Sequence, residues 1–437
     1  MNQYSYKRII KSAIVPIIMM IFTSLYSVVD GLFLSNYAGK EAFAAVGFIM
    51  PFLMLFTSTG FMFGTGSSAL ISKTLGENKK KDANEIFTNI VLFSVILGVI
   101  LLFIAYLLLS PVITMQGANE ELRNNCIKYA SIYLLGIPAC IVQFEFQALF
   151  STAGKKNVGL FASVLSGLLN ILLDYILLKN FNMGLTGAAL ASIISQYIGA
   201  IFSLIYFVNK NSSYLKLVKT KLRLKDVIKS CSNGSSEMVN NISISIVSFV
   251  YNIMLLKYGG ENAISAYATM SYINFLFTAI FWGYITATAP TISYEYGAKN
   301  HANIHDLLRK SIIIICVSSI TMFILSFSLS TVIPTIFVGY NKELLELTIH
   351  GFRIFSFVFL FSGLSIFLSS FFTALNNGLI SAILSFTRVF LFQIPLVILL
   401  PLGLKLDGVW LSVSLAEILT ILLGFFFIIK YRKKYQY

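Results

Sequence analysis

Long apolar stretches follow one another along almost the whole chain, and they restrict its fold more than any other feature. Each stretch reaches the roughly 20 residues that an α-helix needs to cross the hydrocarbon core of a bilayer. A strand of a membrane barrel needs only about 9 to 11 residues, with strict alternation. The sequence therefore predicts an all-α integral membrane protein with twelve transmembrane helices. Their approximate ranges are 9–34, 44–72, 86–113, 127–152, 158–178, 185–208, 230–256, 264–294, 309–337, 347–374, 380–401 and 407–430.

The composition agrees with a membrane protein and argues against an enzyme. The chain is 57% hydrophobic and 11% charged, with a mean hydropathy of +0.82, which is unlike an ordinary soluble domain. The four cysteines have no CxxC or metal-binding spacing, so we expect neither a disulfide framework nor a zinc site. The sequence contains no Walker, HExxH or GxSxG motif. The first apolar stretch is too long for the apolar part of a signal peptide, and we interpret it as a span.

The positive charges alternate between the two predicted sides of the membrane. Loops on one side, together with both ends of the chain, hold 23 of the 32 Lys and Arg residues, against seven on the other side. Loops rich in Lys and Arg face the cytoplasm. We therefore expect a multi-pass protein with both termini in the cytoplasm. This distribution accounts for the net charge of +14 without a nucleic-acid partner.

The chain shows signs of an internal duplication with an offset of 221 residues. Three pairs of similar loop positions share this offset. Ile71-Ser72 and Gly76 match Ile292-Ser293 and Gly297. Thr152-Ala153 matches Thr373-Ala374, and Leu185-Thr186-Gly187 resembles Leu406-Asp407-Gly408. A duplicated unit of six helices gives two lobes of the same orientation, related by a pseudo-two-fold axis along the membrane normal. We predict lobes over residues 1–208 and 230–437, joined by a basic cytoplasmic linker over residues 209–229 that lies over membrane lipid.

Two carboxylates lie near the same end of two predicted helices in the first half. Asp30 is close to the end of the first span, and Asp174 is close to the end of the fifth. Both spans run in the same direction, so the two acids have a similar depth. Asn170 is four residues before Asp174 and shares its helical face. A charged group inside a membrane helix is costly and usually functional. Such a pair can share a proton or hold a hard cation through oxygen ligands.

Five further ionisable residues fall inside or at the ends of predicted spans. A carboxylate or guanidinium inside a span usually faces a cavity or a partner charge. We regard these residues as candidates for lining a substrate cavity, although interfacial positions or structural ion pairs explain several of them equally well. They are Glu145, Glu237, Glu295, Arg388 and Glu417.

Several motifs, in their order along the chain, resemble those of the multidrug and toxic compound extrusion (MATE) transporters, and in particular their bacterial branch. No single motif is decisive, and the resemblance rests on all of them together over the whole chain. They are LYSVVDGLFL at 25–34, ISKTLGENKKKDA at 71–83, NILLDYILL at 170–178, GLTGAALAS at 184–192, PTISYEYGAKN at 290–300 and GLKLDGVWLSVSLAE at 403–417.

The resemblance implies a fold, an activity and a set of site residues. It implies two six-helix lobes around a central cleft, and secondary active export of amphipathic, often cationic drugs or toxins by antiport with sodium ions or protons. It implies a bacterial cell membrane, no cofactor besides the coupling ion, and a monomer. The cation-coupling residues that it implies are Asp30, Asn170, Asp174, Ser192 (where the family has Thr) and Tyr26, with sodium held at the first three.

Other functions remain open from the sequence. A lipid-linked saccharide flippase of the same superfamily is the nearest alternative, although such proteins usually have more spans or an Arg-rich cavity. A membrane scaffold would need neither paired acids nor duplicated lobes. The sequence does not distinguish sodium from proton coupling.

Overall fold

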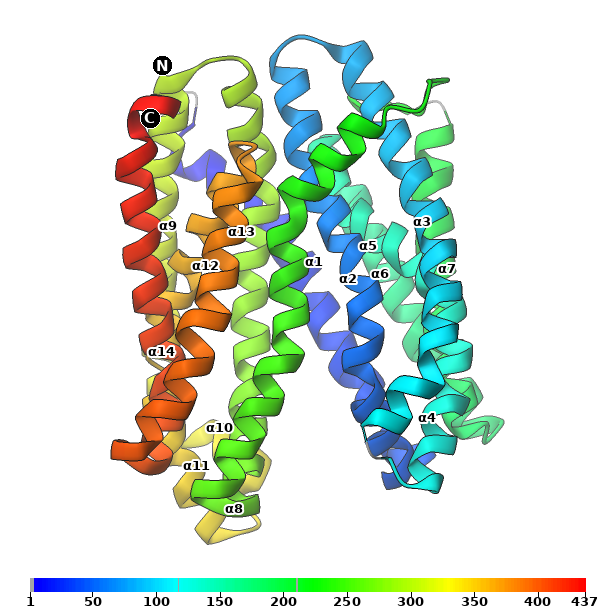
Figure 1. Ribbon diagram of the computed structural model, residues 1–437, viewed down its shortest axis with the longest axis vertical. Helices are drawn as coiled ribbons and strands as arrows, with labels where there is room; N and C mark the ends of the chain where they lie inside the picture. Colours follow the sequence, from blue (N-terminus) through cyan, green and yellow to red (C-terminus); the bar gives the residue numbers. More distant parts are fainter. Residues whose placement is uncertain (1–3, 117, 210) are drawn as a thin grey trace.

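The computed structural model describes residues 4–116, 118–209 and 211–437, and it is a bundle of long helices (Figure 1). No strand occurs among these residues. The first half contains α1 Tyr6–Phe33, η1 Leu34–Ala38, α2 Lys40–Gly76, α3 Lys80–Met115, α4 Glu120–Tyr133, η2 Leu134–Gly136, α5 Ile137–Thr152, α6 Lys156–Asp174, η3 Tyr175–Asn180 and α7 Gly184–Val208. The second half contains α8 Leu224–Gly297, α9 His301–Ser328, α10 Val332–Val338, α11 Lys342–Phe355, α12 Val358–Ala374, α13 Gly378–Phe386, η4 Thr387–Gln393 and α14 Ile394–Tyr435.

The described helices account for the twelve predicted membrane passes. Nine uninterrupted helical stretches in the described part of the chain are long and apolar enough to cross a membrane. Two of them, Leu224–Gly297 and Gly378–Tyr435, contain a non-helical residue at Gly260 (φ 64°) and Lys405 (φ 51°), and each ribbon turns back on itself there (Figure 1). A tenth pass consists of α11 and α12, which meet at 43°. With two passes in each reversing stretch, the prediction of twelve is confirmed.

The buried apolar side chains form one cluster in the first half and two in the second. The first cluster extends from Leu34 to Val227. One cluster of the second half combines the ends of α8, α12 and α14 with the start of α9, and the other surrounds Gly260 and the region near Lys405. Ile9 and Ala13 of α1 belong to the former cluster. The start of α1 therefore packs on the second half, although its sequence belongs to the first.

Both termini lie at the same end of the bundle, which we call the terminal end (Figure 1). At this end α2 and α8 approach so closely that only glycine fits between them. A Cβ atom on Gly66 would lie 2.0 Å from the carbonyl oxygen of Ser230, and one on Gly234 would lie 1.9 Å from that of Met62. Asn376 also donates a hydrogen bond from Nδ2 to the carbonyl oxygen of Ala69, at 3.2 Å. The two halves are thus in tight backbone contact at the terminal end.

The segment after α7 lies along α3 before α8 begins at Leu224. Three side chains of α3 accept hydrogen bonds from its backbone: Asn84 from Lys216 N (2.9 Å), Thr88 from Val218 N (3.0 Å) and Asn89 from Arg223 N (3.0 Å). Arg223 also pairs with Asp82 at 3.2 Å and Glu85 at 3.1 Å. The first turns of α3, from Asp82 to Asn89, thereby hold the connection in place.

Candidate functional site

Asp30 and Asp174 lie where two helices change their winding. Asp174 is the last residue of α6, directly before the π-helical turn η3. Asp30 lies in the last turn of α1, which continues into the π-helical turn η1. Such π-helical turns often occur at functional sites. The two helices approach closely at Gly167 of α6, where a Cβ atom would lie 2.6 Å from the Phe22 ring. The small residue lets α1 and α6 bring the two acids together.

The Asp30 carboxyl group lies close to the side chains of both Asp174 and Asn170. Asp174 and Asn170 are buried, with 0% and 3% of their surface exposed, whereas Asp30 is partly exposed. Both carboxylate oxygens of Asp174, and the amide oxygen Oδ1 of Asn170, have no hydrogen-bond donor among the described residues. Buried acceptors without donors are expensive. A proton shared between the acids, or a cation bound among these oxygens, would satisfy these acceptors.

Tyr129 is a residue of this site that the sequence analysis missed. It lies on α4 with 2% of its surface exposed, and its hydroxyl lies close to Ser192 of α7 and to both acids. Its ring stacks on that of Tyr133, with centroids 5.6 Å apart. The spacing of these tyrosines, one helical turn apart, was the available signal. Four helices of the first half therefore meet at the acids: α1, α4, α6 and α7.

Tyr26 lies one turn before Asp30 on α1 and faces the same group. The oxygen atoms gathered here come from carboxylates, an amide and hydroxyls, which suit a hard monovalent cation such as Na⁺ rather than a soft metal. No group of three or more His, Cys, Asp or Glu side chains with metal-binding geometry occurs within residues 4–116, 118–209 and 211–437. These oxygen atoms could bind a sodium ion, and the two carboxylates could equally well bind a proton.

Glu145 and Glu237 lie outside this site. Glu145 is completely buried on α5, beside Ser94 of α3 and the backbone at Gly64 of α2. Glu237 lies on the first half of α8 and is 2% exposed. It lines a small cavity of about 30 Å³ whose walls come from both halves, including Thr65, Trp282 and Ser370. Of these two acids, Glu237 is the one in a cavity between the halves.

Arg388 and Glu417 form an ion pair inside the second half. Arg388 Nε donates to Glu417 Oε1 at 3.0 Å, and Nη2 donates to the same oxygen. The Glu417 side chain is 3% exposed and that of Arg388 20%. Arg388 lies in the π-helical turn η4. Removing either partner would leave an uncompensated charge.

Glu295 lies at the terminal end rather than in a cavity. It accepts hydrogen bonds from the Tyr4 hydroxyl at 2.5 Å and from Asn303 Nδ2 at 2.9 Å. Burial and the hydrogen bond to Glu295 raise the pKa of the Tyr4 hydroxyl, which therefore stays a neutral donor. Glu295 fastens the start of the chain to the second half.

The chain has twelve membrane passes in two halves. Near one end it holds two neighbouring acids, and buried oxygen atoms there lack hydrogen-bond donors among the described residues. These features define the class of multi-pass membrane transporters. The sequence profile described as MatE matches residues 16–176 and 238–399, which is most of the chain and falls once in each half. The chain therefore belongs to the MatE family, as the motifs predicted. This is a family of transporters and not of enzymes, in agreement with the sequence analysis.

The relatives and solved structures support this membership. The chain is 24% identical to the multidrug export protein MepA of Staphylococcus saprophyticus over 361 residues, covering 79% of this chain and 78% of the relative. It is 23% identical to MepA of Staphylococcus aureus over 91% of this chain and 88% of the relative. A solved outward-facing MATE family multidrug resistance transporter superposes with a TM-score of 0.93 at 22% identity, covering 100% of this chain and 98% of that one. These matches confirm the all-helical fold of this family.

Proposed function

We propose that the protein is a secondary active multidrug exporter, which exchanges amphipathic, often cationic compounds for sodium ions or protons. The observation that carries the proposal is the contact between Asp30 and Asp174, where buried oxygen atoms lack donors. The names of the staphylococcal relatives support the substrate class. Asn170, Ser192 and Tyr26 complete the proposed coupling site.

The coupling follows from the electrostatics of the pair. An ion can shift a conformational equilibrium only if it binds one conformation better than the other. Two carboxylates in contact repel each other in a medium of low dielectric constant, and a proton or a sodium ion between them removes the repulsion. A conformation that holds the acids together is therefore favoured when the ion is bound. A conformation that separates them favours the ion-free form.

Helix α1 connects this site to the contact between the halves. Asp30 lies near one end of α1, whereas Ile9 and Ala13 near the other end pack in the core of the second half. Lys156, at the start of α6, donates hydrogen bonds to the carbonyl oxygens of Ser12 (2.9 Å) and Ala287 (3.4 Å). We infer that residues 1–208 and 230–437 move as two lobes about the linker 209–229. A change at Asp30 then reaches the terminal end through α1.

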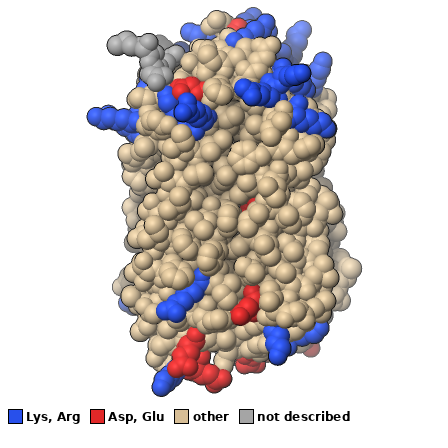
Figure 2. Space-filling model, turned by 90° about the vertical axis from the view of Figure 1, so that its left-hand side faces the viewer, with Lys and Arg blue, Asp and Glu red and all other residues tan. Residues whose placement is uncertain are grey.

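The distribution of charge supports a cytoplasmic terminal end. Lys and Arg side chains gather at the terminal end of the face in Figure 2, and acidic groups are more frequent near the opposite end. Cytoplasmic loops of membrane proteins carry an excess of Lys and Arg. With this orientation, the backbone contact between α2 and α8 closes the cytoplasmic side, and the described conformation is outward-facing.

Ethidium efflux from vesicles under an imposed sodium or proton gradient tests the function. We expect efflux with one of the two gradients, and its loss in Asp30→Asn and in Asp174→Asn with normal amounts of folded protein. Asp407→Asn is the matched control, because this acid lies in the second half, is exposed and pairs with His350 at 2.9 Å. Efflux at the parent rate per folded molecule in either site variant would show that the residue does not couple transport.

A further inference from the structure

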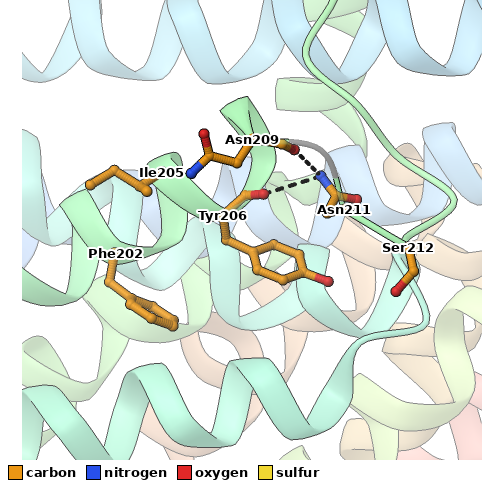
Figure 3. A pocket seen from close by; sticks show the side chains of 6 residues that line it. All are labelled: Phe202, Ile205, Tyr206, Asn209, Asn211 and Ser212. Carbon is orange, nitrogen blue, oxygen red and sulfur yellow. Dashed lines mark hydrogen bonds between the residues drawn. The ribbon is translucent and has the colours of Figure 1, made fainter.

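A groove opens at the terminal end, outside the proposed coupling site. It encloses about 720 Å³, in the range of small-molecule sites. Phe202, Ile205 and Tyr206 line it from the last turns of α7, and Asn209, Asn211 and Ser212 line it from the next segment (Figure 3). The groove therefore has an apolar wall toward the middle of the bundle and a polar wall toward the terminal end.

The apolar wall continues the lipid-facing surface of the protein. The exposed apolar side chains of α7 recur at helical spacing along one face: Ile194, Tyr197, Ile201, Ile205 and Val208. On the adjacent α6, Phe161 is 55% exposed, and its ring lies 5.3 Å from that of Phe202. A hydrocarbon chain lying along this stripe would thus lead directly into the groove.

The polar wall offers hydrogen-bonding groups and one cation. Asn211 Nδ2 donates to the carbonyl oxygens of Tyr206 (3.1 Å) and Asn209 (3.0 Å), which fixes the shape of the turn (Figure 3). Lys155 Nζ donates to Ser212 Oγ at 2.8 Å, so its ammonium group lies against the wall. The Tyr214 ring packs on Gly154, where a Cβ atom would lie 2.8 Å from the ring. The φ of +71° at Gly154 also favours glycine. These contacts keep Lys155 beside the groove.

We propose that this groove binds an anionic phospholipid, with the phosphodiester beside Lys155 and Ser212 and an acyl chain along Phe202 and Ile205. The polarity of the groove matches that of a lipid at the edge of a bilayer: apolar toward the membrane centre, and cationic at the surface. A cationic drug would be repelled by Lys155. A soluble anion would gain nothing from the apolar wall. The two walls together therefore select a lipid with a negative headgroup.

Photo-crosslinking in nanodiscs tests the proposal. The full-length protein is reconstituted with trace amounts of phosphatidylglycerol or phosphatidylcholine that carry a diazirine in one acyl chain, and the labelled peptides are mapped by mass spectrometry. We expect phosphatidylglycerol to label the peptide containing residues 197–208 about five-fold more than phosphatidylcholine, the effect of one cation near an anionic surface. Lys155→Gln should remove this preference, and Ile205→Ser should reduce labelling by both lipids.

Lys219→Gln is the matched control, because Lys219 is an exposed lysine of the same connecting segment and does not line the groove. It should leave the preference unchanged. If Lys155→Gln and Lys219→Gln lose the preference for phosphatidylglycerol equally, the preference reflects general attraction between the basic segment and anionic lipid, and the proposal is overturned. Soluble glycerol phosphate is also added before illumination. Suppression of labelling as strong as that by unlabelled lipid would make the groove a site for anions in general and would also overturn the proposal.

Discussion

At the terminal end, Gly76 of α2 packs against α8 and Gly297 of α8 packs against α2, in a symmetric arrangement. A Cβ atom on Gly76 would lie 2.0 Å from the carbonyl oxygen of Tyr294, and one on Gly297 would lie 1.9 Å from that of Lys73. Lys73 and Tyr294 are separated by the same 221 positions as the two glycines. The sequence repeat is therefore also a contact between the halves, with no room for a side chain on either side.

Substituting Gly76 or Gly297 with alanine should open the terminal end. An added methyl group in such tight packing costs about 1–3 kcal/mol, and only the conformation with the halves in contact bears this cost. We expect the closed population to fall about ten-fold relative to the open one. Electron–electron distances between spin labels on Lys79→Cys and Lys299→Cys would measure this change. Gly47→Ala is the control, because a Cβ there would have no neighbour within 4 Å beyond the adjoining backbone of its own helix. An equal shift in Gly47→Ala would contradict the explanation.

Tyr129→Phe should weaken coupling without abolishing transport. The substitution removes the hydroxyl that lies close to Ser192 and to the two acids, where it can donate one hydrogen bond. One hydrogen bond contributes about 0.5–1.5 kcal/mol, so we expect about a three- to ten-fold increase in the ion concentration needed for half-maximal ethidium efflux. Tyr284→Phe loses a comparable buried hydroxyl, bonded to Ser311 at 2.8 Å in the other half, and should not change the ion dependence. Identical ion dependence in both variants would remove Tyr129 from the site.

Removing one partner of the Arg388–Glu417 pair should destabilise the second half. Arg388→Met leaves the Glu417 carboxylate buried without its cation, which typically costs about 3–5 kcal/mol. The double variant Arg388→Met with Glu417→Gln should recover most of this loss, because no uncompensated charge remains. Thermal unfolding in detergent measures both changes. A double variant that is as unstable as Arg388→Met would show that the charge is not the cause.

Cysteine labelling of intact cells tests the orientation. Lys219 lies in the connecting segment at the terminal end, and Lys257 lies beside the reversal at Gly260; both are exposed. Lys257→Cys should react with a membrane-impermeant maleimide in intact cells, whereas Lys219→Cys should react only after permeabilisation. The parent protein is the control, since Cys126 and Cys140 are buried and Cys231 and Cys316 are partly so. The opposite pattern would place the terminal end outside the cell.

The sequence predicted the membrane passes well because each pass must contain about 20 apolar residues. It was less accurate at their ends, since polar turns such as Lys80–Glu85 remain helical beyond the apolar part. The stretch 309–337 was predicted as one span, but it is divided between α9, which starts at His301, and the short α10.

Only part of the candidate site could be predicted from the sequence. The depth of Asp30 and Asp174 follows from the direction of their helices, so their proximity could be expected from the sequence. The position of Tyr129 depends on how α4 packs beside α6 and α7, and its spacing from Tyr133 shows only that the two rings share one helical face. Likewise, Gly76 and Gly297 marked the repeat in the sequence, but only the packing of α2 on α8 shows why no larger residue fits.

The division of the buried core has a mechanical consequence. The first half has one continuous core, whereas the second has two cores, with half-buried Met322 packed against both. Force applied along the chain should therefore extract the first half as a single cooperative unit and the second half in two steps of different strength. The second half is the more compliant of the two, and bending within it can absorb strain that the first half would transmit undiminished.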